Sequence, residues 1–113
     1  MIEKQSYNEK GQWKILATNE KWSVAFLRYG EKFAEYNQME RHLESDEVFV
    51  LLEGEATLYT PDETCEMEPM VVYNIPKGEW HHITVSHDAT VLVVENSDTS
   101  KENSESKLFE SEK

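Results

Sequence analysis

Short apolar or alternating runs separated by turn residues make up most of the first 96 positions. Runs of about four to eight such residues, bounded by Gly, Pro, Asn or Asp, are typical of β-strands. The clearest run is 47–53, Glu-Val-Phe-Val-Leu-Leu-Glu, which is apolar at odd and at even positions and indicates a strand buried on both faces. The other predicted strands cover residues 13–18, 22–29, 55–60, 65–67, 71–75, 81–86 and 90–95.

The turns between these runs predict how the strands connect. The turn at Glu53-Gly54 predicts a hairpin that pairs strand 47–53 with strand 55–60. Residues 33–39 follow no strict alternation, so we expect a loop or an irregular strand there. No segment before residue 97 has the period of a helix. The pattern therefore predicts an all-β sandwich or barrel of about eight to ten short antiparallel strands.

The composition changes at residue 97. The segment 97–113 holds five Ser and eight charged residues, with Leu108 and Phe109 as its apolar pair. Such a segment buries too little apolar surface to fold alone. We therefore expect one β-domain over residues 1–96 and a polar, flexible C-terminal tail over residues 97–113. The alternative is that Leu108 and Phe109 dock onto a sheet of the same or a neighbouring subunit.

The stretch 39–54 carries the first candidates for chemistry. His42 and Glu47 lie on either side of the turn-prone pair Ser45-Asp46, so one can end a strand and the other can begin the next. Glu47 opens the strand that is expected to be buried. A buried carboxylate is costly unless it is paired, hydrogen-bonded or bound to a metal. Glu47 therefore needs a partner, and the segment Pro-Lys-Gly-Glu-Trp-His at 76–81 offers one in His81.

These two segments resemble the two motifs of the cupin family. They carry the ligands and turn residues of those motifs in the expected order: His42, Glu47 and Gly54, then Pro76, Gly78 and His81. The resemblance covers residues 39–85, and the strand-rich flanks suit the rest of the fold. It implies a small single-domain cupin, a jelly-roll barrel of the double-stranded β-helix type, with His42, Glu47 and His81 as metal ligands.

Three positions depart from the cupin pattern. Glu40 stands where the first motif has its first His, Met70 where the second motif opens with Gly, and Val85 where Asn often follows the last His. Glu40 and His42 share a strand face, and a carboxylate oxygen is a competent ligand. Glu40 is thus a candidate fourth ligand or, if it does not bind the metal, a candidate general base. Two imidazoles and two carboxylates suit Mn, Fe, Ni or Zn without selecting among them.

Structural roles are expected for the remaining His and Cys side chains. His82 points away from His81 in a regular strand, which predicts the outer face or a subunit interface. His87 lies in a turn and is expected to be solvated, and Cys65 has no neighbour that would activate it. Trp80 lies in the loop before His81, where it could wall the mouth of a pocket. The other aromatic residues are expected in the core: Trp22, Phe26, Phe49 and Tyr73.

The charge and the cysteine count exclude several classes of protein. A net charge of -12 at pH 7 argues against nucleic-acid binding, because phosphate contacts need clustered Lys and Arg. The chain has no apolar run of about 18 residues and no basic-then-apolar leader, so we expect no membrane span, no signal peptide and a cytoplasmic location. The single Cys65 excludes an intrachain disulfide.

Three kinds of function fit these features. The cupin resemblance implies either a metal-dependent isomerase, oxygenase or lyase, or a metal-free sensory module that holds a small metabolite; a structural role is the third. We predict one divalent metal in the barrel and a small organic ligand of the carbohydrate or organic-acid class, with the reaction unassigned. The resemblance and the two-sided apolar strand 22–29 also predict a homodimer formed through a sheet face.

Overall fold

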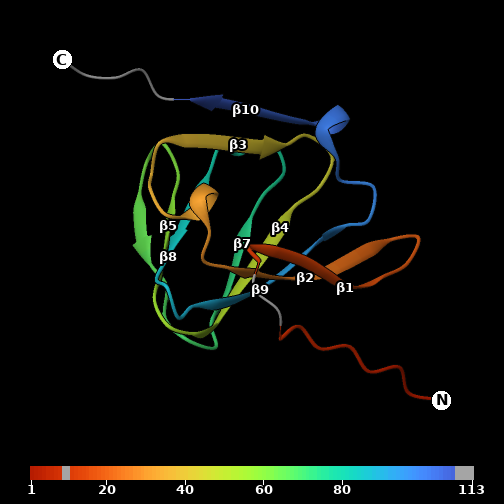
Figure 1. The fold of residues 1–113 in the computed structure, drawn as a ribbon. Helices are drawn as coiled ribbons and strands as arrows, with labels where there is room; N and C mark the ends of the chain where they lie inside the picture. Colours follow the sequence, from red (N-terminus) through yellow and green to blue (C-terminus); the bar gives the residue numbers. More distant parts are fainter. Residues whose placement is uncertain (9–10, 109–113) are drawn as a thin grey trace.

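The four longest strands lie together in one antiparallel sheet of five strands. The computed structural model describes residues 1–8 and 11–108, and within them this sheet has the order β1-β2-β9-β4-β7. Strands β2, β9 and β4 are hydrogen-bonded on both sides, so they form its interior. The five strands are β1 (Trp13–Thr18), β2 (Trp22–Arg28), β9 (Thr90–Asn96), β4 (Glu47–Glu53) and β7 (Val72–Ile75) (Figure 1).

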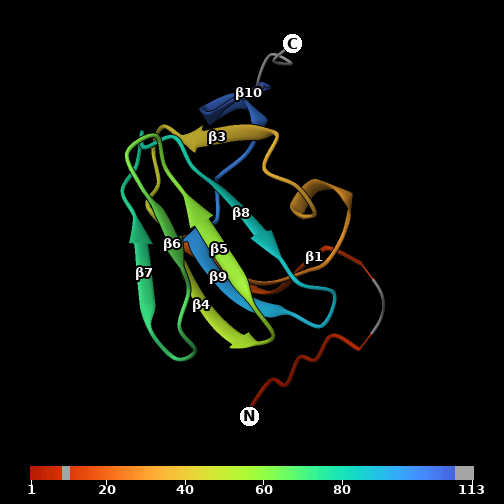
Figure 2. The same cartoon turned by 90° about the vertical axis from the view of Figure 1, so that its left-hand side faces the viewer.

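A second layer is built in two parts, with the β3–β10 pair at one end of the molecule (Figure 1 and Figure 2). The three-stranded part has the order β6-β5-β8, and the two-stranded part pairs β10 with β3. A backbone bridge between Glu40 and His81 joins the two parts, with N···O distances of 2.8 and 2.9 Å. The elements are η1 (Glu31–Phe33), β3 (Gln38–His42), β5 (Ala56–Tyr59), β6 (Thr64–Glu66), β8 (His82–Val85), η2 (Lys101–Asn103) and β10 (Ser104–Leu108).

Alternation along the strands explains why the two layers pack together. Leu27 of β2, Phe49 and Leu51 of β4 and Val91 and Val93 of β9 share the inner face, and each is at most 2% exposed. They form one cluster with the inward side chains of β5 and β8. Burying a side chain of this size stabilises the fold by about 1.5–3 kcal/mol. This core fixes the direction of β4, and with it the position of Glu47.

The architecture confirms the all-β prediction. Ten strands and two short 3₁₀ helices are described, the ladders are antiparallel, and no α-helix occurs in residues 1–8 and 11–108. Facing sheets whose neighbouring strands are mostly distant in sequence are a jelly-roll arrangement. In these same ranges no helix is long and apolar enough to cross a membrane.

The predicted hairpin between 47–53 and 55–60 is wrong. β4 pairs with β7 and β9, whereas β5 pairs with β6 and β8 in the other layer. Gly54 has a φ of 75°, and a Cβ there would lie 2.6 Å from the Cα of Ala89. The chain therefore needs glycine at this position, but it uses the turn to cross between layers instead of folding back.

The C-terminal segment contributes a strand where the sequence predicted a flexible tail. β10 pairs with β3 from Ser104 opposite His42 to Leu108 opposite Gln38. Most of β10 is exposed, so backbone pairing and not apolar burial holds it, and composition does not reveal such a strand. Leu108 is 76% exposed and does not dock onto a sheet of its own subunit, and Phe109 lies outside the described residues. The domain boundary at residue 96 stays a prediction.

The outer face of the five-stranded sheet is largely apolar, and no other strand of the described residues packs on it. Trp22 and Phe26, which were predicted to be core residues, lie on this face, and Trp22 is 46% exposed. Phe49 is a core residue as predicted, and Tyr73 packs against the core. Half-buried neighbours complete the outer face across the sheet: Val24, Val48, Val50, Leu92 and Val94.

Met70, which stands where the second cupin motif has Gly, adopts the conformation that favours Gly. Its φ is 65°, in the left-handed region, and its side chain is 77% exposed. An L-residue pays about 1–2 kcal/mol for this conformation, while Gly loses about 0.5–1 kcal/mol more backbone entropy on folding. Met70→Gly is therefore expected to stabilise the protein by about 0.5–1 kcal/mol in urea unfolding. A destabilised variant would contradict the strained backbone.

Candidate metal centre

Glu47 is the centre of the cluster of polar side chains inside the fold. It is the first residue of β4, on the same inner face as Phe49 and Leu51, and it is 4% exposed. Its Oε1 atom lies 3.1 Å from His42 Nε2 and 2.9 Å from His81 Nε2. As predicted, His42 ends one strand and Glu47 begins the next. Side chains from three segments thus meet at one carboxylate oxygen: His42 from the end of β3, Glu47 from the start of β4, and His81 from just before β8.

His42 presents a buried nitrogen to the cluster. Its Nδ1 lies 2.7 Å from the Oγ of Ser104, the residue opposite it on β10. Its Nε2 is close to Glu47 but not in the direction of a hydrogen bond, so this atom has no hydrogen-bond partner among the described residues. A buried nitrogen without a partner costs free energy. A cation held between Nε2 and Glu47 would remove that cost.

His81 has one nitrogen whose state is fixed by its partner. Its Nδ1 lies 3.0 Å from the carbonyl oxygen of Glu79, which can only accept, so Nδ1 carries the proton. The Nε2 atom then faces Glu47 Oε1 either as an imidazolium N–H or as a lone pair. A lone pair next to a carboxylate oxygen is repulsive unless a cation lies between them. The geometry therefore demands a proton or a metal ion at this point.

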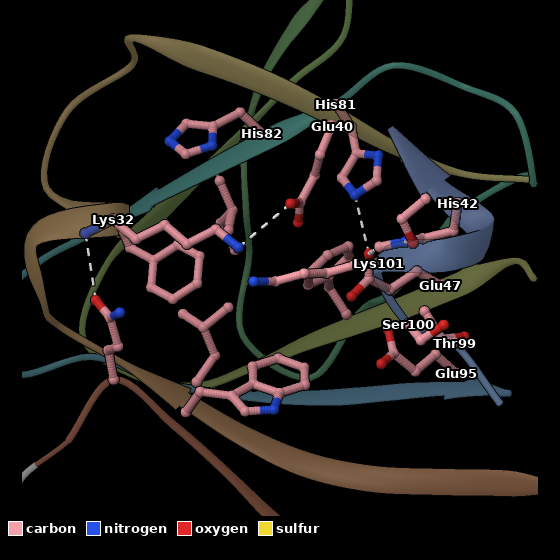
Figure 3. A pocket seen from close by; sticks show the side chains of 17 residues that line it. Lys32, Glu40, His42, Glu47, His81, His82, Glu95, Thr99, Ser100 and Lys101 are labelled. Carbon is pink, nitrogen blue, oxygen red and sulfur yellow. Dashed lines mark hydrogen bonds and ion pairs between the residues drawn. The ribbon is translucent and has the colours of Figure 1, made fainter. Parts of the chain in front are cut away.

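Glu40 lies beside these residues, as its spacing from His42 predicts. It stands two residues before His42 on β3, and its backbone bridges His81. Its carboxylate Oε2 lies 3.2 Å from Lys32 Nζ, in a partly exposed ion pair. The ligand atoms of Glu40, His42 and His81 lie within 4.8 Å of one another. Figure 3 shows the Glu40 carboxylate reaching into the cavity between Lys32 and His81.

A fifth side chain, Glu95, belongs to the cluster and was missed in the sequence. It lies on β9 directly opposite Glu47, and its ligand atom lies within 4.8 Å of those of His42 and Glu47. The signal was present in the chain: Val91, Val93 and Glu95 have the same parity, so Glu95 must face the interior like the two valines. Carboxylates directly opposite each other repel unless a proton or a cation lies between them.

The contacts of the cluster shift its titration. Burial would raise the pKa of Glu47, but the close contacts with His42 and His81 and the charges of both rings lower it to about 2. Burial lowers the pKa of His42 and His81, yet contact with Glu47 and the nearby negative charges outweigh it, so both pKa values are raised. Burial, followed by the charge of Glu47, raises the pKa of Glu95 to about 8. Without a metal, the cluster near neutral pH holds protons.

These shifts predict how the stability of the metal-free protein depends on pH. The raised pKa values of Glu95, His42 and His81 stabilise the fold at low pH, and this contribution falls as the pH rises from 4.5 to about 8 for Glu95 and upward from 6.5 for the histidines. The lowered pKa of Glu47 stabilises the fold above pH 4.5 and loses that effect as the pH falls toward 2. Metal-free protein is therefore expected to melt at a lower temperature at about pH 9 than at about pH 6.

Glu95→Gln tests whether the cluster causes this pH dependence. The variant should show a smaller fall in melting temperature between about pH 6 and pH 9. Metal binding releases ligand protons, so the stabilisation added by a divalent ion is expected to increase over the same pH range. Thermal unfolding at several pH values, with and without metal, measures both effects. A metal-free protein that becomes more stable above pH 6 would contradict the proton-filled cluster.

The cluster lies at one side of a cavity of about 390 Å³. The cavity lies between the layers, and Lys101 and Ser100 of the C-terminal segment reach its wall (Figure 3). Lys32, Thr99, Ser100 and Lys101 were not singled out in the sequence, because the last three come from the segment that was expected to be a free tail. Their position makes the C-terminal segment part of the site.

Several other sequence candidates lie elsewhere than expected. His82 is buried at 3% exposure and also lines the cavity, so the outer-face prediction is wrong; its Nε2 lies 3.0 Å from the Glu35 carbonyl oxygen, and burial lowers its pKa. Trp80 does not wall the cavity but packs between Arg41 and Lys107, at 4.5 and 4.3 Å from its ring centroid. Cys65 is half-buried against the core, as an idle thiol would be.

The donor set fits a divalent cation. Two imidazole nitrogens meet the Glu47 carboxylate at a buried point, with Glu40 on one side and Glu95 on the other, and imidazole with carboxylate suits Mn, Fe, Ni or Zn. His42 Nε2 has no hydrogen-bond partner in the described chain, and Ser104 and the Glu79 carbonyl orient the two rings through their other nitrogens. Such outer partners are typical of metal-binding histidines. The cluster can therefore hold a metal ion.

Comparison with known proteins identifies the fold. No family model matches the chain, and no curated protein matches it. Among solved structures, a cupin-2 domain protein from Shewanella frigidimarina NCIMB 400 has a TM-score of 0.64 at 19% identity, over 78% of this chain and 82% of that one. KdgF from a Halomonas species has a TM-score of 0.64 at 15% identity, over 83% and 87%.

The widest match among these comparisons is with Pac13 of Streptomyces, described as a nucleoside dehydratase. Its TM-score is 0.73 at 10% identity, over 98% of this chain and 95% of that one. Identities this low establish the fold and leave the activity open. The jelly-roll layers, the order of the strands and these matches agree with one another. The chain is a small protein with the cupin fold.

Proposed function

We propose that this chain is a small cupin that binds one divalent metal ion at the His/Glu cluster and binds or acts on a small organic molecule in the adjoining cavity. The observation that carries the proposal is the convergence of two buried imidazole Nε2 atoms on one oxygen of Glu47, at 2.9 and 3.1 Å. A site of this kind beside a cavity of about 390 Å³ combines a metal with room for a ligand.

His42, Glu47 and His81 are the proposed ligands, and Glu40 is the proposed fourth. If Glu40 instead keeps its ion pair with Lys32 at 3.2 Å, its carboxylate lies beside the cavity as a general base. A divalent ion at this point supplies a Lewis acid that polarises a bound oxygen. The reaction class would then be that of an isomerase, oxygenase or lyase.

The ligand is proposed to be a carbohydrate or a small organic acid, handled in the cytoplasm. The similarity in fold to a nucleoside dehydratase supports a small polar molecule as the ligand. The lining of the cavity supports the same conclusion, because it offers apolar side chains for a carbon skeleton and charged or polar side chains for polar groups.

A metal-free binding module is the second candidate, and one observation favours it. The contact of 2.9 Å between His81 Nε2 and Glu47 Oε1 is also satisfied by a proton. The pKa of His81 is raised by that contact, although burial opposes the shift. In this case the cavity holds a small metabolite without catalysis.

Titration of the metal-free protein separates the two candidates. Calorimetry with Mn²⁺, Fe²⁺, Ni²⁺ and Zn²⁺ is expected to show at least one ion bound with one site per chain, and a matching rise in the melting temperature. His87→Ala serves as the control, because His87 is exposed and stacks on Tyr29, away from the cluster. If none of the four ions binds, the metal-free module is the better account.

We also propose that two copies pair through the outer face of the five-stranded sheet. Phe26 lies in the middle of that apolar face, between Lys14 of β1 and Leu92 of β9. Phe26→Asp places a charge in the proposed contact and is expected to yield monomer in light scattering, because an unpaired charge is costly to bury. Leu43→Asp, at an exposed position outside the face, should leave the dimer intact. If the Phe26→Asp variant has the same molar mass in light scattering as a wild-type dimer, the proposed interface is wrong.

A further inference from the structure

Two lysines enter the cavity from opposite sides. Figure 3 shows Lys32 reaching in from η1 and Lys101 reaching in from η2, beside the His/Glu cluster. They are the Lys and Arg residues among the described lining residues. In a chain with a net charge of -12, two cationic groups directed into one cavity are unexpected. A negatively charged ligand would explain their placement.

The two lysines differ in what they contact. Lys32 Nζ lies 3.2 Å from Glu40 Oε2, so its charge is balanced by the protein. Lys101 is exposed and has no ion pair or side-chain hydrogen bond in the part of the chain that the structure describes. The cavity wall therefore offers one ammonium group that no described carboxylate pairs. A single ammonium matches a monoanion, whereas a phosphate ester is usually met by several cationic or backbone donors.

Thr99, next to Lys101 on the same segment, also lacks a partner. Its Oγ1 atom is buried and makes no hydrogen bond with any described residue, and the residue lines the cavity. A buried hydroxyl without a partner is unfavourable, because it loses its hydrogen bonds to water. A ligand oxygen at this side of the cavity would accept from the hydroxyl while its charge meets Lys101.

Part of the wall is apolar. Leu27, Phe33, Phe49 and Ile83 line the cavity and are each at most 5% exposed. Such a surface favours a carbon skeleton over a densely hydroxylated one. The volume of about 390 Å³ lies near the lower end of ligand pockets. The cavity thus combines one unpaired ammonium group, that of Lys101, with apolar contact surface.

We infer that the cavity binds a small organic monocarboxylate, with Lys101 pairing its carboxylate, Thr99 donating a hydrogen bond to it and the apolar wall holding its carbon skeleton. The inference rests on the proposed function in taking a small organic molecule as the ligand, and it narrows the organic-acid class to monoanions. It also gives the C-terminal segment a role: η2 supplies the recognition group, and its pairing through β10 places that group at the cavity.

The test compares acids with their neutral amides. Butyrate, hexanoate and benzoate, each beside the corresponding amide, are titrated into metal-free and into metal-loaded protein and followed by ligand-observed NMR. At least one acid is expected to bind about tenfold more tightly than its amide. In the metal-free protein, Lys101→Gln should abolish this preference, while Lys21→Gln, which changes the same charge in the exposed turn before β2, should leave it intact.

Thr99→Val gives a second measurement that folding defects do not mimic. Because the hydroxyl has no partner in the described chain, the variant should unfold at the same temperature as the wild type or at a higher one, while its affinity for the acid falls several-fold. The inference is overturned if no acid binds better than its amide, or if the preference survives in Lys101→Gln.

Metal content, measured on the same samples, keeps the two proposals apart. If the protein binds no metal but prefers the acid to its amide, the carboxylate site is supported and the proposed metal centre is contradicted. Metal binding without any preference for the acid does the reverse.

Discussion

Replacing Glu47 by Gln is expected to abolish metal binding at the cluster. The side chain keeps its shape but loses the charge that faces His42 Nε2 and His81 Nε2. Loss of an outer-shell partner alone weakens metal affinity by about 10–100-fold, so loss of a charged ligand is expected to cost more than about 100-fold. Calorimetric titration of the metal-free variant with the ion that the wild type binds measures the change.

The same variant has a second signature in the absence of metal. Glu47 raises the pKa of His42, His81 and Glu95 through its contacts and its charge. Glu47→Gln should therefore lower the pKa of both imidazoles in an NMR titration. Glu66→Gln, at an exposed position of β6, is the matched control and should change neither property. Wild-type affinity in Glu47→Gln would show that the cluster is not the metal site.

Removing the ring of Phe49 is expected to cost the most stability. Phe49 is 2% exposed, belongs to the core cluster between the layers, and lies edge-on to the His81 ring at a centroid distance of 6.0 Å. Phe-to-Ala changes in a core typically cost about 3–5 kcal/mol. The free energy of unfolding of such a domain is about 5–15 kcal/mol in total, so Phe49→Ala should lose a large share of this stability.

Urea unfolding of the metal-free protein checks this value without a contribution from bound metal. Leu43→Ala is the control, because Leu43 is 42% exposed outside the outer face and its truncation should stay within about 0.5 kcal/mol. A Phe49→Ala variant that is as stable as Leu43→Ala would mean that the two layers do not pack through this ring.

The fold was predictable where apolar burial sets the strands. Residues 47–53 form β4 with the predicted bounds, because a short continuous apolar run bounded by turn residues is typical of a strand buried on both faces. β10 was not predictable, since its burial pattern is exposed at nearly every position and its ladder with β3 joins segments far apart in the chain. The hairpin prediction was wrong because a turn shows where the chain changes direction but not which strand the next segment pairs with.

The candidate site follows the same division. Motif spacing brought His42, Glu47 and His81 together, and the strand period added Glu40. Glu95 could have been added by its parity with Val93. Lys101, Thr99 and Ser104 could not, because they reach the site only through the pairing of β10 with β3. The prediction for His82 was wrong because strand alternation does not show which loops cover a strand. Here the loop that carries Glu35 covers His82 and buries it.

The most direct test of the central claim is elemental analysis of protein purified without a metal-affinity tag, with His42→Ala and His81→Ala prepared in parallel. The account predicts close to one Mn, Fe, Ni or Zn ion per chain in the wild type and loss of that ion in both variants, because each removes an imidazole from the same buried point. Wild-type protein that is free of metal and stays so after incubation with each ion would contradict the account. The cavity would then belong to a metal-free binding protein.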